Sequence, residues 1–87
     1  MRVLVVGLAG TGAAMVERAR AEGHDVVVLE DHPDGHAYAT RATRVRELGA
    51  DVLEAPGADL VQELAAAVDL VVPSPGVAPV HPATRAA

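Results

Sequence analysis

Three glycines and one threonine follow an apolar run near the start of the chain, in the stretch VVGLAGTGAA. The pattern is typical of a strand that turns into a helix, and the first turn of a helix leaves backbone N–H groups without partners. These groups and the partial positive charge at a helix start favour an anion. The loop 7–12 is therefore predicted to bind a phosphate, with the Thr11 hydroxyl as a further donor or as the helix cap. In the alternative interpretation, Gly7, Gly10 and Gly12 only allow a tight turn and close helix packing.

The spacing of these glycines leaves the kind of phosphate open. The dinucleotide fingerprint G-x-G-x-x-G would need glycines at positions 7, 9 and 12, whereas this chain has them at positions 7, 10 and 12. Ala9 stands where the second glycine would let the backbone approach a pyrophosphate closely. The loop is either a variant dinucleotide site or a site for a different phosphate.

Two further segments carry groups that suit a nucleotide. Glu30 ends a second apolar run, at the place where a dinucleotide-binding fold positions its ribose-binding acid. Asp31 follows it, and this acidic pair would repel a 2′-phosphate. The stretch Ser74-Pro75-Gly76 offers a hydroxyl and backbone N–H groups, with a proline before it and one within it. It is predicted to form the second wall of a phosphate site, the alternative being an ordinary turn after a strand.

The chain offers little for catalysis or for a metal ion. Asp31, His32, Asp34 and His36 lie close in sequence, but a single loop without supporting hydrogen-bond partners rarely makes a specific metal site, and none is predicted. There is no cysteine, no pairing of a nucleophile with a base, and no Gly-Lys-Ser/Thr phosphate loop. The sequence therefore predicts a domain that binds a ligand and has no catalytic residues.

Length and composition bound the class of protein. The 87 residues are expected to form a single domain, 1–87, with an aliphatic core, because 51% of them are hydrophobic and the only aromatic one is a tyrosine. A net charge of −5 argues against a nucleic-acid partner, which needs a basic surface. No apolar stretch approaches the roughly 20 residues of a membrane span, and no signal peptide is visible. A cytoplasmic location without a membrane partner is therefore expected.

Short apolar runs alternate with amphipathic stretches along the chain. They predict strands at 3–6, 26–29, 51–53 and 69–72, helices at 11–22, 38–48 and 58–68, and the start of another helix after His81-Pro82. On the third helix, the residues expected to face inward are Leu60, Val61, Leu64 and Val68.

Strands that alternate with helices form a parallel sheet through right-handed crossovers. The predicted fold class is a Rossmann-like three-layer α/β/α domain whose four-stranded parallel sheet has the order 3-2-1-4. Ligands of such sheets bind beyond the carboxyl ends of the strands, where the winding direction reverses. Here that crevice falls between the first and fourth strands, and the loops 7–12 and 73–76 flank it.

Three stretches together resemble the N-terminal domain of the Mur ligase family: GLAGTGAA, GHDVVVLED and VDLVVPSPGVAPVHP. The family's first loop has the pattern G-x-G-x-[ST]-G, which Gly7, Thr11 and Gly12 match and Ala9 does not. The later pattern, Asp-x-Val-Val-x-Ser-Pro-Gly-[VI] followed by His-Pro, is the more specific one. It is matched by Asp69, Val71, Val72, Ser74, Pro75, Gly76, Val77, His81 and Pro82. The resemblance covers essentially the whole chain.

The resemblance implies a domain that holds the uridine diphosphate part of UDP-N-acetylmuramoyl-L-alanine, a nucleotide-sugar substrate of peptidoglycan synthesis. The residues that would cradle the diphosphate are Gly10, Thr11 and Gly12. The residues that would close the other side of the site are Ser74, Pro75 and Gly76. The residues that would contact uracil are Glu30, Asp31 and His32, where the family more commonly has Asp, then Thr or Asp, then Arg.

ATP and Mg²⁺ are cofactors of the central domain in this family, and the amino acid is bound largely by a C-terminal domain. The 87 residues match neither of these domains, so the resemblance implies an N-terminal fragment of a three-domain ligase that is inactive without them. The fifth strand of the family's sheet is also missing. An open edge on the fourth strand would favour self-association.

Two other functions remain open. The chain could be an NAD-binding Rossmann domain of a dehydrogenase or of a potassium-uptake regulator. Glu30 favours this alternative, and Ala9 and the motif Ser74-Pro75-Gly76 oppose it. It could also be a scaffold that associates through the open sheet edge and binds no nucleotide.

Overall fold

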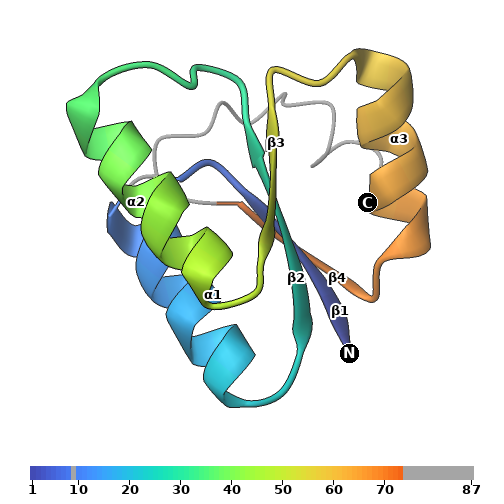
Figure 1. Cartoon of the computed structure of the whole chain (residues 1–87). Coiled ribbons are helices and arrows are strands. Elements are labelled where there is room, and N and C mark those ends of the chain that lie inside the picture. The colour runs from blue at the N-terminus through green and yellow to red at the C-terminus, as the bar shows by residue number, and fades with distance from the viewer. Residues whose placement is uncertain (9, 74–87) are drawn as a thin grey trace.

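A four-stranded, all-parallel sheet in the order β3-β2-β1-β4 lies at the centre of the fold (Figure 1). The computed structural model describes residues 1–8 and 10–73. The elements in chain order are β1 (Arg2–Val6), α1 (Gly10–Ala21), β2 (Asp25–Glu30), α2 (His36–Glu47), β3 (Asp51–Glu54), α3 (Ala58–Ala67) and β4 (Leu70–Pro73). The Rossmann-like α/β fold and the strand order predicted from the sequence are confirmed.

The two central strands are buried on both faces, as their unbroken runs of valine and leucine predict. From Val3 to Val6 in β1, no residue is more than 4% exposed, and from Val26 to Leu29 in β2 none is more than 7% exposed. The edge strands β3 and β4 are shorter and only half-buried in their middle residues. Because all four strands are parallel, their carboxyl ends meet at one edge of the sheet.

Helices cover both faces of the sheet, with α1 and α2 on one face and α3 on the other (Figure 1). The core on the α1–α2 side consists of Val3, Val5, Leu8, Val16, Val26, Val28, Tyr38, Ala42, Val45 and Ala50. The core on the α3 side consists of Leu4, Val6, Val27, Leu29, Val61 and Ala65. Nearly all of these side chains are small and aliphatic, as the composition predicts.

The carboxyl-terminal ends of α1 and α2 are joined by Arg20. Its Nε donates to the carbonyl of Leu48 at 2.8 Å, and its Nη1 donates to the carbonyl of His24 at 3.0 Å. The two turns contain the predicted stop residues Gly23 and Gly49, whose φ angles of 84° and 95° lie in the left-handed region. Arg20 therefore holds together two turns at the amino edge of the sheet, opposite the carboxyl ends of the strands.

Apart from element bounds that shift by one residue, two details of the sequence prediction differ from the structure. Leu60 was expected to face inward but is 42% exposed, whereas Val61 and Ala65 are buried. The inward stripe of α3 is centred on these two residues, and Leu60 lies about 100° around the helix from Val61. The second helix begins at His36 rather than at the predicted residue 38, and Gly35 is its N-cap residue. The predicted helix after His81-Pro82 falls outside the described residues.

A search of residues 1–8 and 10–73 for membrane spans finds no helix with the length and apolar character that crossing a bilayer requires.

Candidate functional site

The winding direction of the sheet reverses between β1 and β4, and their carboxyl ends lie side by side. Val6, the last residue of β1, pairs with Leu29 of β2 on one side and with Pro73 of β4 on the other. The chain winds from β1 through β2 to β3 and then crosses to the far side of β1 to form β4. The turn between β1 and α1 therefore leaves the sheet at the switch point, where open parallel sheets bind their ligands.

Two hydrogen bonds and a buried leucine fix the turn after β1. Gly7 has a φ of 90°, which glycine adopts without strain, and its N–H donates to the carbonyl of Leu29 at 2.8 Å. Leu8 is 2% exposed and belongs to the core on the α1–α2 side. The N–H of Leu8 donates to Oε1 of Glu30 at 3.0 Å. The protein itself thus uses the N–H groups of residues 7 and 8.

The first turn of α1 consists of Gly10, Thr11 and Gly12, which we call the amide end. The first N–H groups of an α-helix have no partner within the helix. Gly10 and Thr11 are exposed and Gly12 is buried. Among residues 1–8 and 10–73, no atom lies within 4 Å of a Cβ placed on Gly10, and no acidic residue lies in this turn. The amide end therefore combines open space, backbone donors and the positive end of a helix dipole, as an anion site requires.

Acidic side chains surround the ends of the two neighbouring strands. We call Glu30, Asp31, Asp34 and Glu54 the acidic rim. Glu30 and Glu54 pair in the register of β2 with β3, and Asp31 and Asp34 are exposed on the loop that follows β2. Carboxylates repel a phosphate, so the acidic rim and the amide end have opposite electrostatic preferences.

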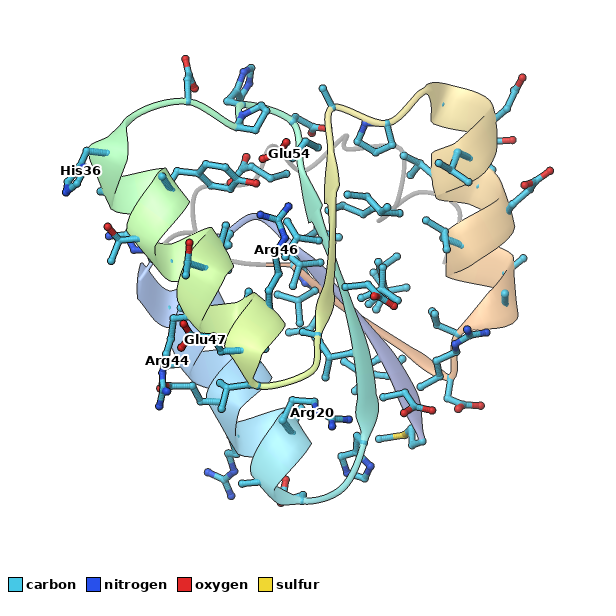
Figure 2. All side chains as sticks on the ribbon, viewed as in Figure 1. Arg20, His36, Arg44, Arg46, Glu47 and Glu54 are labelled. Atoms are coloured by element: carbon cyan, nitrogen blue, oxygen red, sulfur yellow. The ribbon has the colours of Figure 1, made fainter. Side chains whose placement is uncertain are left out.

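Tyr38 is joined to the acidic rim by a hydrogen bond. Its hydroxyl donates to Oε2 of Glu54 at 2.6 Å, and the residue is 8% exposed. Burial, followed by the hydrogen bond to Glu54 and the charge of Glu54, raises the pKa of Tyr38 to about 12. The charge of Arg46 acts in the opposite direction. Figure 2 shows Glu54 where β3 ends and Arg46 extending from α2 toward the same end of the sheet.

Sequence reasoning placed Tyr38 on the inward face of a helix but missed its bond to Glu54. A buried tyrosine hydroxyl usually has a hydrogen-bond partner. Tyr38 is the only tyrosine of the chain and stands near the start of its helix, at the height of the strand ends. From the sequence, these two facts were enough to predict that the Tyr38 hydroxyl bonds an acidic residue at a strand end.

The residues predicted to contact uracil lie together at the carboxyl end of β2 and in the loop that follows it. Glu30 is half-buried, and its Oε2 accepts the N–H of His32 at 3.0 Å. Asp31 and His32 are exposed. The bond between Glu30 and the N–H of Leu8 links this group to the turn that leads into the amide end.

The predicted second wall of the site, Ser74, Pro75 and Gly76, lies outside the described residues, and its role stays a prediction. The metal hypothesis for the loop after β2 was not favoured from the sequence. Among residues 1–8 and 10–73, no group of three or more His, Cys, Asp or Glu side chains is placed to hold a metal ion.

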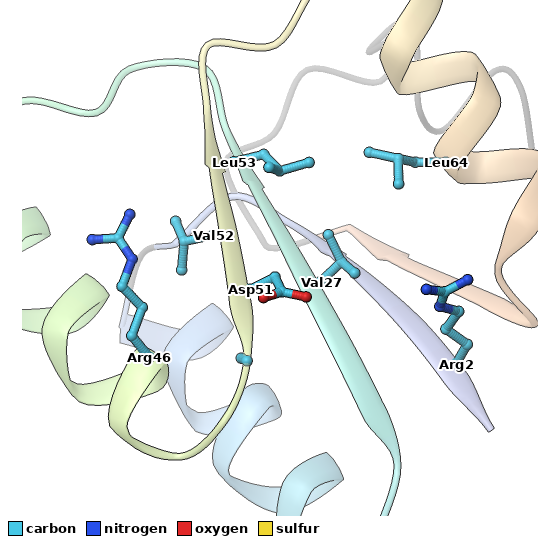
Figure 3. Close-up of a pocket in the computed structure, with 8 residues that line it drawn as sticks. Arg2, Val27, Arg46, Asp51, Val52, Leu53 and Leu64 are labelled. Atoms are coloured by element: carbon cyan, nitrogen blue, oxygen red, sulfur yellow. The ribbon is translucent and has the colours of Figure 1, made fainter.

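A hollow of about 520 Å³ lies along the edge strand β3 (Figure 3). It is lined by Arg2, Val27, Arg46, Ala50, Asp51, Val52, Leu53 and Leu64. Leu53 and Leu64 face each other across the gap between β3 and α3, while Arg46 and Val52 lie on the α2 side of the strand (Figure 3). None of its lining residues belongs to the amide end or the acidic rim. Its existence depends on how α3 sits over the sheet, which the sequence pattern does not specify.

No protein-family model matches the sequence, and a search of curated proteins finds no significant relative. The function must therefore be inferred from the chain's own residues.

Proposed function

We propose that this chain binds the uridine diphosphate part of UDP-N-acetylmuramoyl-L-alanine, as the N-terminal domain of a Mur-type ligase acting in the cytoplasm. Its motifs are most similar to those of the D-glutamate-adding ligase, MurD. The observation that carries the proposal is the amide end, where the described residues leave open space above Gly10 at the start of a helix, at the switch point of the sheet.

The charge distribution at the strand ends supports a ligand with one anionic and one neutral part. A diphosphate at the amide end would accept hydrogen bonds from the N–H groups of the first turn and from the Thr11 hydroxyl. The nucleoside would extend toward β2, where the carboxylates of the acidic rim disfavour a second phosphate. Asp31 and His32, both exposed there, would contact uracil, and Ser74, Pro75 and Gly76 would close the far side.

Catalysis would belong to further domains. The chain contains no lysine and therefore lacks the lysine of an ATP phosphate loop. We accordingly place the binding of ATP and Mg²⁺, and the formation of the bond to D-glutamate, in central and C-terminal domains that partner this one. Alone, the domain would bind the nucleotide and perform no reaction.

One observation favours NAD as an alternative ligand. Glu30 lies at the carboxyl end of β2, where dinucleotide-binding folds place the acid that holds a ribose. Here, however, each oxygen of this carboxylate accepts a backbone N–H group, from Leu8 and from His32. The position of Glu30 therefore matches a dinucleotide site, but its hydrogen bonds give it a role within the protein.

The test is an amide NMR titration of the chain with UDP, and in parallel with NAD and with uridine. We expect saturable shifts at Gly10, Thr11 and Gly12 with UDP, no comparable response to NAD, and binding of uridine at least about tenfold weaker because it lacks the diphosphate. Saturable binding of NAD at the same residues with equal or higher affinity would replace the proposal by the dinucleotide alternative. A chain that responds to neither nucleotide would refute both.

A further inference from the structure

The carboxylate of Glu30 joins two segments of backbone that are far apart in sequence. Its Oε1 accepts the N–H of Leu8, a residue 22 positions away, at 3.0 Å. Its Oε2 accepts the N–H of His32 at 3.0 Å. One side chain at the end of β2 thus holds both the turn that leads into α1 and the start of its own loop.

Of these two hydrogen bonds, the one to Leu8 would cost more free energy to lose, because it is the more buried. The Leu8 side chain is 2% exposed, and the hydrogen bond between its N–H and Glu30 is partly buried. A buried N–H without an acceptor costs free energy, and a bond to an ionised acceptor is stronger than one between neutral groups. Glu30 therefore provides an ionised acceptor at a place where water reaches the backbone poorly.

This bond determines which N–H groups face a ligand. The N–H of Gly7 donates to the carbonyl of Leu29 and that of Leu8 donates to Glu30, so two successive residues are held against β2. The helix then begins at Gly10. Within the part of the chain that the structure describes, the next backbone donors after Leu8 are those of the amide end.

We infer that Glu30 is a positioning residue for the anion site: it acts through the backbone of Leu8 to hold the turn in the geometry that presents the amide end. The inference rests on the proposed function, because it concerns the same site. It is distinct from the predicted role of Glu30 in contacting uracil, because it concerns the backbone N–H groups that the two carboxylate oxygens accept within the protein.

Two substitutions separate the effect of the length of the Glu30 side chain from the effect of its charge. In Glu30→Gln one oxygen remains to accept an N–H, but the amide nitrogen cannot accept the second, and the negative charge is lost. In Glu30→Asp the charge remains, but the side chain is one methylene shorter and cannot reach both N–H groups. Asp34→Asn is the control, because it removes one charge from the acidic rim and leaves the two bonds of Glu30 intact.

The first measurement is hydrogen exchange of the Leu8 amide in the chain without ligand. We expect exchange about tenfold faster in both Glu30 variants and unchanged in Asp34→Asn, because the local opening of the turn no longer breaks a charge-assisted hydrogen bond. Unchanged exchange at Leu8 in the Glu30 variants would overturn the inference.

The second measurement is the affinity for UDP and for inorganic pyrophosphate. Loss of a negative charge alone would tighten the binding of both anions, as in the control. We expect the opposite sign for the Glu30 variants: both anions bind about fivefold more weakly, by the same factor, because the turn must be ordered on binding. Weaker binding of UDP with unchanged binding of pyrophosphate would show direct contact with the nucleoside and would overturn the inference.

The same measurements separate this inference from the proposed function. A wild-type chain that binds pyrophosphate but not UDP would refute the proposed function, and weaker pyrophosphate binding in the Glu30 variants would still support the positioning role. A wild-type chain that binds neither anion would refute both.

Discussion

The amide end and the acidic rim lie at the same edge of one sheet and are built by opposite means. At the amide end two of the three residues are glycines, so the described residues leave open space above Gly10, and a ligand would meet backbone donors and the Thr11 hydroxyl. At the acidic rim the groups are carboxylates, and several of their oxygens are already used. Glu30 accepts two backbone N–H groups, and Glu54 accepts the hydroxyl of Tyr38.

This difference explains how a chain with a net charge of −5 can offer an anion site. The donors of a helix start act over the first turn only, while exposed carboxylates are screened by salt over about 10 Å. The backbone donors therefore attract a phosphate in direct contact with the helix start, while the carboxylates of the acidic rim weaken this attraction less as the salt concentration rises. A ligand that is anionic at one end and neutral at the other is oriented by this division.

The largest expected effect tests whether the amide end is anchored in the core. Leu8→Ala should lower the free energy of unfolding by about 3 kcal/mol, because it removes a fully buried side chain beneath the turn. Leu60→Ala is the matched control, since Leu60 is 42% exposed and its truncation should cost less than about 1 kcal/mol. Urea unfolding of both variants measures the difference. Equal losses would mean that the turn is not anchored by Leu8.

A smaller effect is expected at the acidic rim. Tyr38→Phe removes the hydroxyl that donates to Glu54 and should lower the free energy of unfolding by about 1 kcal/mol. UDP affinity should stay within about twofold of the wild-type value, because the phosphate is bound by other groups. A large loss of UDP affinity at unchanged stability would show that the acidic rim and the amide end do not act independently.

The ionisation of Tyr38 reports on the same hydrogen bond. The phenol should titrate at about 12 rather than at its usual 10.0, and absorbance of the phenolate measures this directly because the chain has one tyrosine. The folded-state pKa is raised, so the stabilisation is complete below pH 10 and is lost as pH rises toward 12. Glu54→Gln should lower the pKa of Tyr38 but leave it above 10, since burial remains the largest cause of the shift. An unchanged pKa would rule out a contribution from Glu54.

The smallest effect concerns the charge of the loop after β2. Asp34→Asn should tighten UDP binding by up to about twofold at low salt, because it removes one exposed charge that repels the diphosphate. The gain should disappear at high salt, where such charges are screened. Isothermal titration calorimetry at two salt concentrations tests this. Weaker binding in this variant would mean that Asp34 contacts the ligand favourably.

The sequence was sufficient to predict the fold because each element had an unambiguous pattern. The runs from Val3 to Val6 and from Val26 to Leu29 have the length and β-branched character of buried strands. Glycines at 23 and 49 marked the ends of the helices before them. With strands and helices in alternation, right-handed crossovers that wind outward from the first strand and then cross to its other side gave the observed strand order.

For the candidate site, the sequence predicted the location but not the hydrogen bonds that shape it. Strand ends and the switch point follow from topology, so the amide end and Glu30 were expected near each other. The bond from Leu8 to Glu30 depends on the positive φ of Gly7 and on the rotamer of one glutamate, and neither is encoded in a periodic pattern. Leu60 shows the same limit on α3: it precedes buried Val61 just as half-buried Leu64 precedes buried Ala65, so the helical pattern alone does not tell the two leucines apart.

The most direct test of the central claim is the affinity of UDP for Gly10→Val, compared with Gly57→Val. Both glycines stand at the start of a helix, and a Cβ on either would meet no atom of the described residues within 4 Å. A Cβ in a helix points toward its amino-terminal end, so the valine at position 10 would occupy the space of the bound phosphate. The valine at position 57 replaces an N-cap residue and should lower the free energy of unfolding by up to about 1 kcal/mol. This variant therefore also controls for a loss of stability at a helix start. We predict that Gly10→Val weakens UDP binding at least about tenfold while Gly57→Val binds UDP like the wild-type chain. Equal affinity in all three chains would contradict a diphosphate site at the amide end.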